Sequence, residues 1–149
     1  MKVKVFLENG AKLPERQHDG DYCYDVYATS LEVVNGIYIY GTGIHTAFPS
    51  YVPETKTAIC LQPFARSGIF KTGLILCNGI GIVDSNYRKE IHGMFYKICE
   101  GIEPIYNVGE RFMQIALSNG EDIEWVQVNS LEELGTTDRD GGFSSTGRL

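Results

Sequence analysis

The sequence predicts an all-β domain, arranged as a sandwich or a barrel. Short runs that alternate polar with apolar residues, or that are rich in β-branched and aromatic residues, recur along the chain. Glycine punctuates most of the gaps between them, and no long stretch carries the apolar stripe of a helix, with its period of about 3.6 residues. Many short strands with turns roughly every eight to twelve residues are typical of sandwiches and barrels.

The strand signals are taken in chain order. Residues 2–6 alternate, residues 36–40 are β-branched and aromatic, residues 56–61 alternate again, and residues 124–128 end the series. Turns are predicted at Asn9-Gly10, Asn35-Gly36, Gly41-Thr42-Gly43 and Asn119-Gly120.

The best helical signal is the capping-box pattern at residues 130–133, which predicts one turn that ends at Gly135. We expect the packed domain to occupy residues 1–134. Residues 135–149 hold four glycines and little besides Phe143 to bury, so they cannot offset their own ordering entropy. We expect them to form a mobile C-terminal arm.

Size and charge limit the possible functions. The chain has 149 residues, enough for one domain with a core that needs no metal or disulfide. Its formal net charge is −6, which argues against a nucleic-acid partner, because nonspecific phosphate binding needs a basic face. A polyanionic substrate must therefore find a local group of arginines.

The cysteines indicate a reducing environment. Cys23, Cys60, Cys77 and Cys99 have neither CxxC spacing nor nearby histidine pairs, so we expect reduced core thiols rather than a zinc site. The apolar run at residues 1–6 is too short for a signal peptide, and no stretch approaches the roughly 20 apolar residues of a membrane span. We expect a cytoplasmic protein without membrane contact, in the host cytoplasm if the source is viral.

Two polar islands carry the chemistry. Arg66-Ser67-Gly68 has the parts of a phosphate cradle, since a guanidinium can fork onto phosphate oxygens while a hydroxyl and a glycine N–H offer further donors. Residues 78–87 bracket the carboxylate of Asp84 with an amide and a phenol. Together these groups suit a nucleoside triphosphate whose phosphorus is attacked near an acid.

Five segments, in order, resemble motifs one to five of the trimeric dUTP pyrophosphatase (dUTPase) family. They are residues 21–28 (DYCYDVYA), 65–68 (ARSG), 78–87 (NGIGIVDSNY), 109–114 (GERFMQ) and 137–147 (TDRDGGFSSTG). The resemblance implies a jelly-roll-like β-barrel, the dUTPase-like β-clip, assembled as a homotrimer. Active sites would lie at subunit boundaries, each closed by the arm of a neighbour, and dUTP would be hydrolysed to dUMP and pyrophosphate with Mg²⁺.

The resemblance assigns Asp84 as the general base that activates the water attacking the α-phosphorus. Taken alone, Asp84 could be a turn aspartate, since Asp-Ser-Asn favours local side-chain to backbone bonds. Tyr87 is expected to lay its ring beneath the deoxyribose, although a strand tyrosine more commonly packs in a sheet.

Asn78 can match the pyrimidine edge, and the glycines that follow permit a tight hairpin whose backbone amides read uracil. Asn-Gly is also a plain turn signal, so Asn78 alone is equivocal. The resemblance implies a pocket too narrow for the 5-methyl group of thymine. The other expected substrate contacts of this segment are Gly81, Ile82 and Val83.

Asp25 lies in a strand-like run, where an inward charge is costly unless it is paired or bound to a cation. The resemblance makes it the aspartate that reaches Mg²⁺ through water. The alternative is a solvent-facing carboxylate. Gln114 is expected to donate its amide to a phosphate oxygen, and Arg111 to pair with a nearby carboxylate and hold the shape of the site.

In the arm, Arg139 is expected to fork onto the terminal phosphate and Phe143 to stack over the uracil. Ser144, Ser145 and Thr146 complete the expected substrate contacts, with hydroxyl donors at Ser145 and Thr146. Closure of this lid would exclude water.

The chain departs from the family pattern at Cys23, Asn86, Lys89 and Ser144. None replaces an assigned catalytic group, but Lys89 leaves the shape of the hairpin open and Ser144 restricts the arm. Two alternatives also stay open. A dCTP deaminase would need a glutamate where Met94 stands, and a dUTPase-like trimer could instead regulate a partner through a nucleotide-dependent arm.

Overall fold

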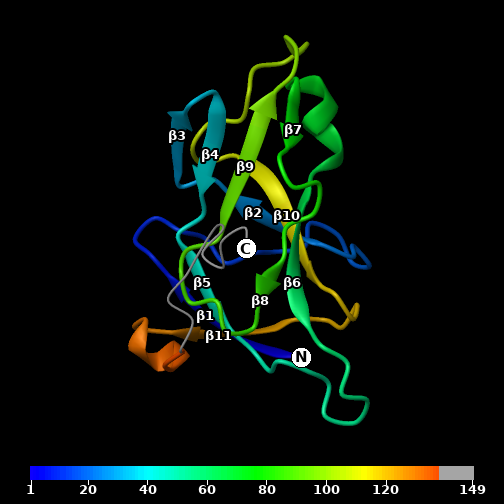
Figure 1. Ribbon diagram of the computed structural model, residues 1–149, viewed down its shortest axis with the longest axis vertical. Helices are drawn as coiled ribbons and strands as arrows, with labels where there is room; N and C mark the ends of the chain where they lie inside the picture. The colour runs from blue at the N-terminus through cyan, green and yellow to red at the C-terminus, as the bar shows by residue number, and fades with distance from the viewer. Residues whose placement is uncertain (138–149) are drawn as a thin grey trace, which may run out of the picture.

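The computed structural model describes residues 1–137, which form three hydrogen-bonded sheets with two short 3₁₀ turns (Figure 1). No α-helix occurs in this part of the chain. The all-β prediction is therefore confirmed. The sheets remain separate over residues 1–137 and do not close into one barrel, so the jelly-roll-like arrangement is built from open sheets.

The first sheet joins the two ends of the domain. Strand β1 (Lys2–Leu7) lies between β11 (Glu124–Val128), to which it is parallel, and β5 (Ile44–Ala47), to which it is antiparallel. Val3 and Val5 face inward and are fully buried, whereas Lys2 and Lys4 point outward. This alternation is the pattern that predicted the strand.

The second sheet carries most of the candidate site. Its order is β2 (Tyr24–Tyr27), β10 (Arg111–Leu117), β6 (Cys60–Ala65) and β8 (Val83–Asp84), and all neighbours are antiparallel. The 3₁₀ turn η1 (Ser67–Lys71) follows β6 almost directly. Three of the sequence motifs, residues 21–28, 65–68 and 109–114, therefore meet at one end of this sheet.

The third sheet has the order β3 (Ser30–Val34), β4 (Ile37–Gly41), β9 (His92–Lys97) and β7 (Leu74–Leu76). The hairpin between β3 and β4 turns at Asn35 and Gly36, whose φ angles are 51° and 80°. Positive φ at both central residues is what a two-residue hairpin turn needs, and it explains the Asn-Gly pair.

An aromatic cluster packs the second sheet against the third. The rings of Tyr40 and Phe112 stack with their centroids 4.9 Å apart, and Phe95 meets Tyr40 edge-on at 5.7 Å. Gly93 lies against this cluster, where an added Cβ would come within 2.6 Å of the Phe112 ring. The aromatic rings thus occupy the space that a side chain at position 93 would need, which explains the glycine in this strand.

The strand predicted at residues 56–61 is wrong in its bounds. The chain turns at Lys56, where φ is 57°, and the strand runs from Cys60 to Ala65 as β6. Pro63 would normally argue against a central strand, because it lacks an N–H. Its carbonyl oxygen nevertheless accepts a bond from the Gly81 N–H at 2.9 Å, so hydrogen bonding continues past the proline.

The predicted turn near residue 130 is present as η2 (Glu132–Leu134), and it ends at Gly135 with φ of 85°. No side-chain cap closes its start; instead the Glu133 carboxylate accepts the N–H of Asn129 at 3.3 Å. All four cysteines are free, as expected, but they lie half-buried or exposed rather than in the core.

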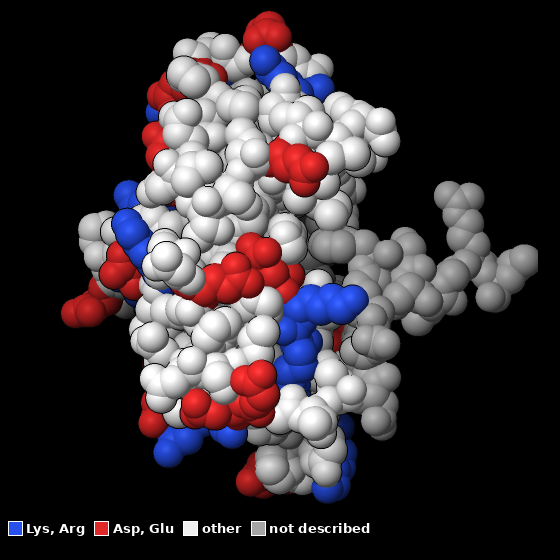
Figure 2. All heavy atoms as spheres, turned by 90° about the vertical axis from the view of Figure 1, so that its left-hand side faces the viewer, with Lys and Arg blue, Asp and Glu red and all other residues white. Residues whose placement is uncertain are grey.

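Figure 2 shows the face on the side of β3, where acidic side chains form several separate groups and a compact basic group lies near the centre. Within residues 1–137, no helix is long and apolar enough to cross a membrane. No three His, Cys, Asp or Glu side chains in the same range form a group that could hold a metal ion.

Candidate active site

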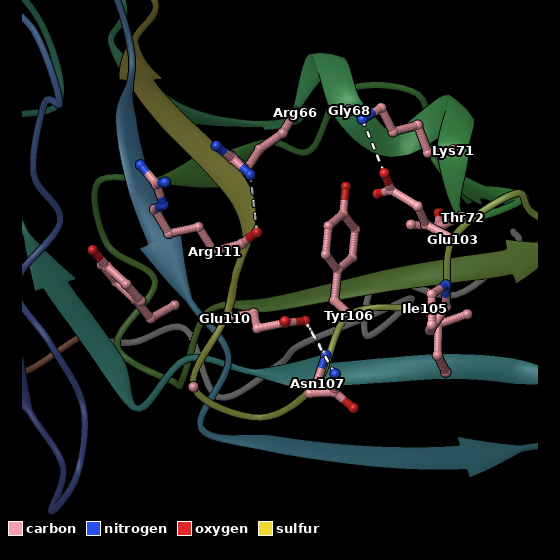
Figure 3. A pocket seen from close by; sticks show the side chains of 13 residues that line it. Arg66, Gly68, Lys71, Thr72, Glu103, Ile105, Tyr106, Asn107, Glu110 and Arg111 are labelled. Carbon is pink, nitrogen blue, oxygen red and sulfur yellow. Dashed lines mark hydrogen bonds and ion pairs between the residues drawn. The ribbon is translucent and has the colours of Figure 1, made fainter.

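A buried carboxylate clamps two arginines at one end of the second sheet. Asp25 on β2 is only 8% exposed. Its Oδ1 accepts a hydrogen bond from Arg66 Nε at 2.9 Å, and its Oδ2 accepts one from Arg111 Nη1 at 3.0 Å. Arg66 Nη1 also donates to the carbonyl oxygen of Arg111 at 3.2 Å (Figure 3). The guanidinium groups are thereby fixed side by side.

This clamp answers two expectations. Arg111 pairs with a carboxylate, as predicted. The alternative of a solvent-facing Asp25 is wrong, because β2 lies beside β10 in the sheet and turns the carboxylate toward the arginines. A buried charge needs such partners, and the clamp supplies two.

The predicted phosphate cradle lies in a cavity of about 450 Å³. Ser67, Gln114 and Cys23 line it together with Asp25 and the two arginines. The Gln114 side chain donates one N–H to the Ala65 carbonyl at 3.3 Å, which leaves its oxygen and a second N–H for another partner. Burial and the Asp25 carboxylate raise the pKa of the Cys23 thiol, which favours its neutral form.

A neighbouring cavity of about 550 Å³ shares Arg66 and Arg111 as a wall and includes Gly68 (Figure 3). No motif in the sequence predicted a second cavity beside the cradle. Tyr106 extends toward η1, and burial raises the pKa of its phenol. Lys71 of η1 donates to Glu103 at 3.0 Å, so the far side of the cavity carries a paired charge.

Two of the predicted base-reading residues, Asn78 and Gly81, line a separate cavity of about 200 Å³. Gly81 is close to the Pro63 ring, which an added Cβ would meet at 3.0–3.1 Å. None of the remaining lining residues was a predicted binding residue; they are Pro63, Leu76, Cys77, His92 and Met94. His92 and Met94 alternate on β9, a period-two signal that places them on one face.

The predicted hairpin around Asn78 is wrong. Asn78 and Gly79 form a turn, but β7 pairs with β9 in the third sheet and β8 pairs with β6 in the second. The segment therefore crosses between sheets. The Gly79 N–H bonds to the Leu76 carbonyl at 3.1 Å and the Gly81 N–H bonds to Pro63, so both amides already have partners.

The neighbours of Gly81 differ in exposure. Ile82 is 60% exposed, whereas Val83 is 8% exposed and packs in the core. A nucleotide could therefore meet the side chain of Ile82 but only the backbone of Val83. Burial raises the pKa of the Cys77 thiol at the pocket wall, which favours a neutral lining.

Asp84 and Tyr87 flank one tight turn. Asp84 ends β8 and is half-buried, and its carbonyl oxygen accepts the N–H of Tyr87 at 3.0 Å. The Tyr87 ring packs partly against the core, and its hydroxyl donates to the Glu90 carbonyl at 3.2 Å. The core therefore covers the Tyr87 ring only in part.

The structure keeps Asp84 apart from the cradle of the same chain. Asp84 pairs with Cys60 at the start of β6, whereas Arg66 follows the end of that strand. Six residues of extended chain correspond to roughly 20 Å. The predicted general base and the predicted phosphate-binding residues therefore lie in two separate parts of the described fold.

A dUTPase family model matches residues 9–147 of this chain. The deoxyuridine 5'-triphosphate nucleotidohydrolase of Mycobacterium tuberculosis is 33% identical over 149 residues, which cover 96% of this chain and 92% of the relative. The enzyme of that name from Corynebacterium efficiens is 32% identical over 145 residues, covering 95% and 75%. The chain belongs to the dUTPase family.

Solved dUTPase structures share this fold. The dUTPase from phage phi11 of Staphylococcus aureus has a TM-score of 0.60 at 18% identity, covering 77% of this chain and 88% of that one. A mutant of the Staphylococcus bacteriophage 80alpha dUTPase with dUpNHpp has a TM-score of 0.62 at 21% identity, covering 97% and 98%. A phi11 dUTPase mutant is described as coordinating a structural Mg(II) ion.

In this dUTPase chain, the residues expected in the arm lie outside the described residues. These are Arg139, Phe143, Ser144, Ser145 and Thr146. The expected metal contact is Asp25, both of whose oxygens already accept guanidinium N–H bonds. Each carboxylate oxygen has a second lone pair, so Asp25 can still accept a bond from a metal-bound water. A single carboxylate suits Mg²⁺, which keeps several waters and takes most other ligands from substrate phosphates.

We expect Asp25→Ala to lower the free energy of unfolding by about 2–3 kcal/mol, because it leaves two partly buried guanidiniums without their carboxylate. Urea denaturation measures this change. Glu124→Gln is the control, since its pair with Lys2 spans 3.6 Å between two exposed side chains. It should leave the denaturation midpoint unchanged. A midpoint for Asp25→Ala equal to that of the control would contradict a stabilising role for the clamp.

Proposed function

We propose that this chain hydrolyses dUTP to dUMP and pyrophosphate. Membership of the dUTPase family supports the reaction class. The observation that carries the proposal is the presence of two complementary half-sites. One is a cradle walled by arginines, which suits a polyphosphate, and the other is a small pocket containing Asn78, which suits a pyrimidine.

The reaction follows from the proposed roles of two groups. The Asp84 carboxylate accepts a proton from a water whose oxygen forms a bond to the α-phosphorus. The bond from that phosphorus to the bridging oxygen of the β-phosphate breaks, and pyrophosphate leaves with the electron pair. Tyr87 lies under the sugar, where a 2′-hydroxyl would meet its ring. This contact favours deoxyribose over ribose.

The cradle binds the departing phosphates. Arg66, Ser67 and Gln114 donate to their oxygens. The hydrogen bond to Asp25 holds the Arg66 side chain in place when pyrophosphate leaves. Magnesium bound by the triphosphate would neutralise part of its charge, with Asp25 accepting a bond from one of the metal's waters. The protein contributes orientation and donors, which are the main needs of phosphoryl transfer.

The complete site is shared between copies of the chain in a homotrimer. Support comes from the separation of roughly 20 Å between Asp84 and Arg66 along β6. A neighbouring copy can bring its own cradle to the Asp84 turn. Residues 135–149 then act as an arm that closes over the nucleotide of a neighbouring subunit, with Arg139 on phosphate and Phe143 on the base.

The pocket argues against a dCTP deaminase. Met94 lines the cavity where that reaction needs a glutamate to move protons at the cytosine ring. A thioether cannot carry a proton in that role. The described lining of this cavity contains no carboxylate.

Pyrophosphate release from dUTP, dTTP, UTP and dCTP tests base, methyl and sugar selection together. We expect kcat/KM for dUTP to exceed each of the others by at least about 100-fold, because a misfit in the pocket leaves buried polar groups unpaired or forces a clash. Comparable turnover of dTTP or UTP would contradict the assigned pocket. Ammonia released from dCTP would instead support the deaminase.

A further inference from the structure

Arg88 lies directly after the turn that carries Asp84 and Tyr87, and it has no role in the proposed chemistry. The structure joins its guanidinium to three backbone segments. Nη1 donates to the carbonyl oxygen of Ser85 at 2.6 Å and to that of Thr46 at 3.1 Å, and Nε donates to that of Gly135 at 3.3 Å. Charged donors on carbonyl oxygens are among the stronger hydrogen bonds.

These three carbonyls belong to different parts of the fold. Ser85 is in the turn from Asp84 to Tyr87, the catalytic turn, and Thr46 is a fully buried residue of β5 in the first sheet. Gly135 ends η2 and is the first residue of the proposed arm. Arg88 thus ties the catalytic turn to a buried strand and to the first residue of the arm.

The main chain of Arg88 is held as well. His45 on β5 is 6% exposed, and its Nδ1–H donates to the Arg88 carbonyl oxygen at 2.8 Å. The other ring nitrogen of His45 lies 2.8 Å from Glu8 Oε1. With backbone and side chain both anchored, Arg88 has little freedom to swing into a nucleotide. Its position suits a support rather than a ligand contact.

We propose that Arg88 is a positioning residue, which holds the Asp84 turn and the start of the arm in one fixed relation. This inference rests on the proposed dUTP hydrolysis. Loss of the guanidinium would let the turn and Gly135 move independently. Misplacement of a catalytic group by about 1 Å can cost on the order of 100-fold in rate. Ground-state binding of the base and phosphates depends on other residues and should change less.

The test compares Arg88→Met, Arg88→Lys and Lys4→Met with wild type in the full chain. Lys4 is the matched control, because its Nζ donates to the Glu133 carbonyl at 3.1 Å and so ties down η2 without contact to the catalytic turn. We expect Arg88→Met to lower kcat by about 30-fold with KM changed by less than about threefold. Arg88→Lys should recover part of this loss. Lys4→Met should stay within about twofold of wild type.

Two further readouts separate positioning from a general loss of stability. Free guanidinium at millimolar concentration should raise kcat of Arg88→Met but not of Lys4→Met. Hydrogen exchange at the Tyr87 amide, which bonds to the Asp84 carbonyl, should be faster in Arg88→Met, while exchange in β10 should be unchanged. If Arg88→Met does not fold, Arg88→Lys decides by the same kcat and exchange criteria.

Each outcome either supports or overturns the inference. Wild-type kcat in a folded Arg88→Met overturns it, and so does an equal loss in Lys4→Met, which would assign the effect to fraying of η2. Absence of pyrophosphate release from dUTP by wild type would refute the proposed function instead. In that case faster Tyr87 exchange in Arg88→Met would still support the positioning role, and unchanged exchange would overturn it.

Discussion

Asp84→Asn is expected to lower kcat for dUTP hydrolysis by at least about 100-fold, with nucleotide binding near that of wild type. The amide has almost the size of the carboxylate, so the end of β8 and its turn should persist. An amide cannot accept the proton of the attacking water. Pyrophosphate release gives kcat, and calorimetric titration with a dUTP analogue that resists hydrolysis gives the binding constant.

Glu32→Gln is the matched control for this variant. It makes the same change from carboxylate to amide at an exposed position of β3, away from the residues that line the candidate cavities. Its turnover should equal that of wild type. Equal turnover in Asp84→Asn would remove Asp84 from the mechanism. A parallel loss of analogue binding would mean that Asp84 contacts substrate rather than acting as the base.

Deletion of residues 139–149 is expected to spare folding and to lower dUTP turnover by at least about 100-fold. Within residues 1–137, the buried core runs from Val3 to Leu134, and the truncated chain keeps all of these residues. The loss of activity follows from the proposed lid, since Arg139 and Phe143 would no longer reach phosphate and base. Circular dichroism and size-exclusion chromatography report the fold and assembly, and pyrophosphate release reports the activity.

Arg139→Ala with Phe143→Ala in the full-length chain is the companion experiment. It should reproduce most of the loss without shortening the chain. Aggregation of the truncated protein, or a smaller assembly, would show that residues 139–149 belong to the packed structure. Full activity of the truncated protein would contradict the lid.

The strand predictions were right where the alternation of polar and apolar residues matched the alternation of exposed and buried side chains. Residues 2–6 alternate because Val3 and Val5 enter the core, and β1 follows that pattern. The same reasoning was wrong for residues 56–61, because alternation does not show where a partner strand begins. Pairing with β10 carries β6 through Pro63 to Ala65, and this long-range pairing overrode the local signal.

The base-reading segment shows the same limit. Asn78-Gly79 turns the chain as its local chemistry requires, since Gly79 has φ of 68°. Local chemistry does not determine which strands pair on either side of a turn. The partners of β7 and β8 lie in different sheets, so the expected hairpin is a crossing between sheets.

The sequence by itself determined the strand class, the family and the chemical types at each motif, because these depend on side-chain identity and short spacing. Only the tertiary structure decided that Asp25 clamps two arginines, that Arg88 joins three segments, and that Asp84 lies far from Arg66. These relations depend on strand order and register. Strand order and register come from contacts between residues that are distant along the chain, and no local pattern records them.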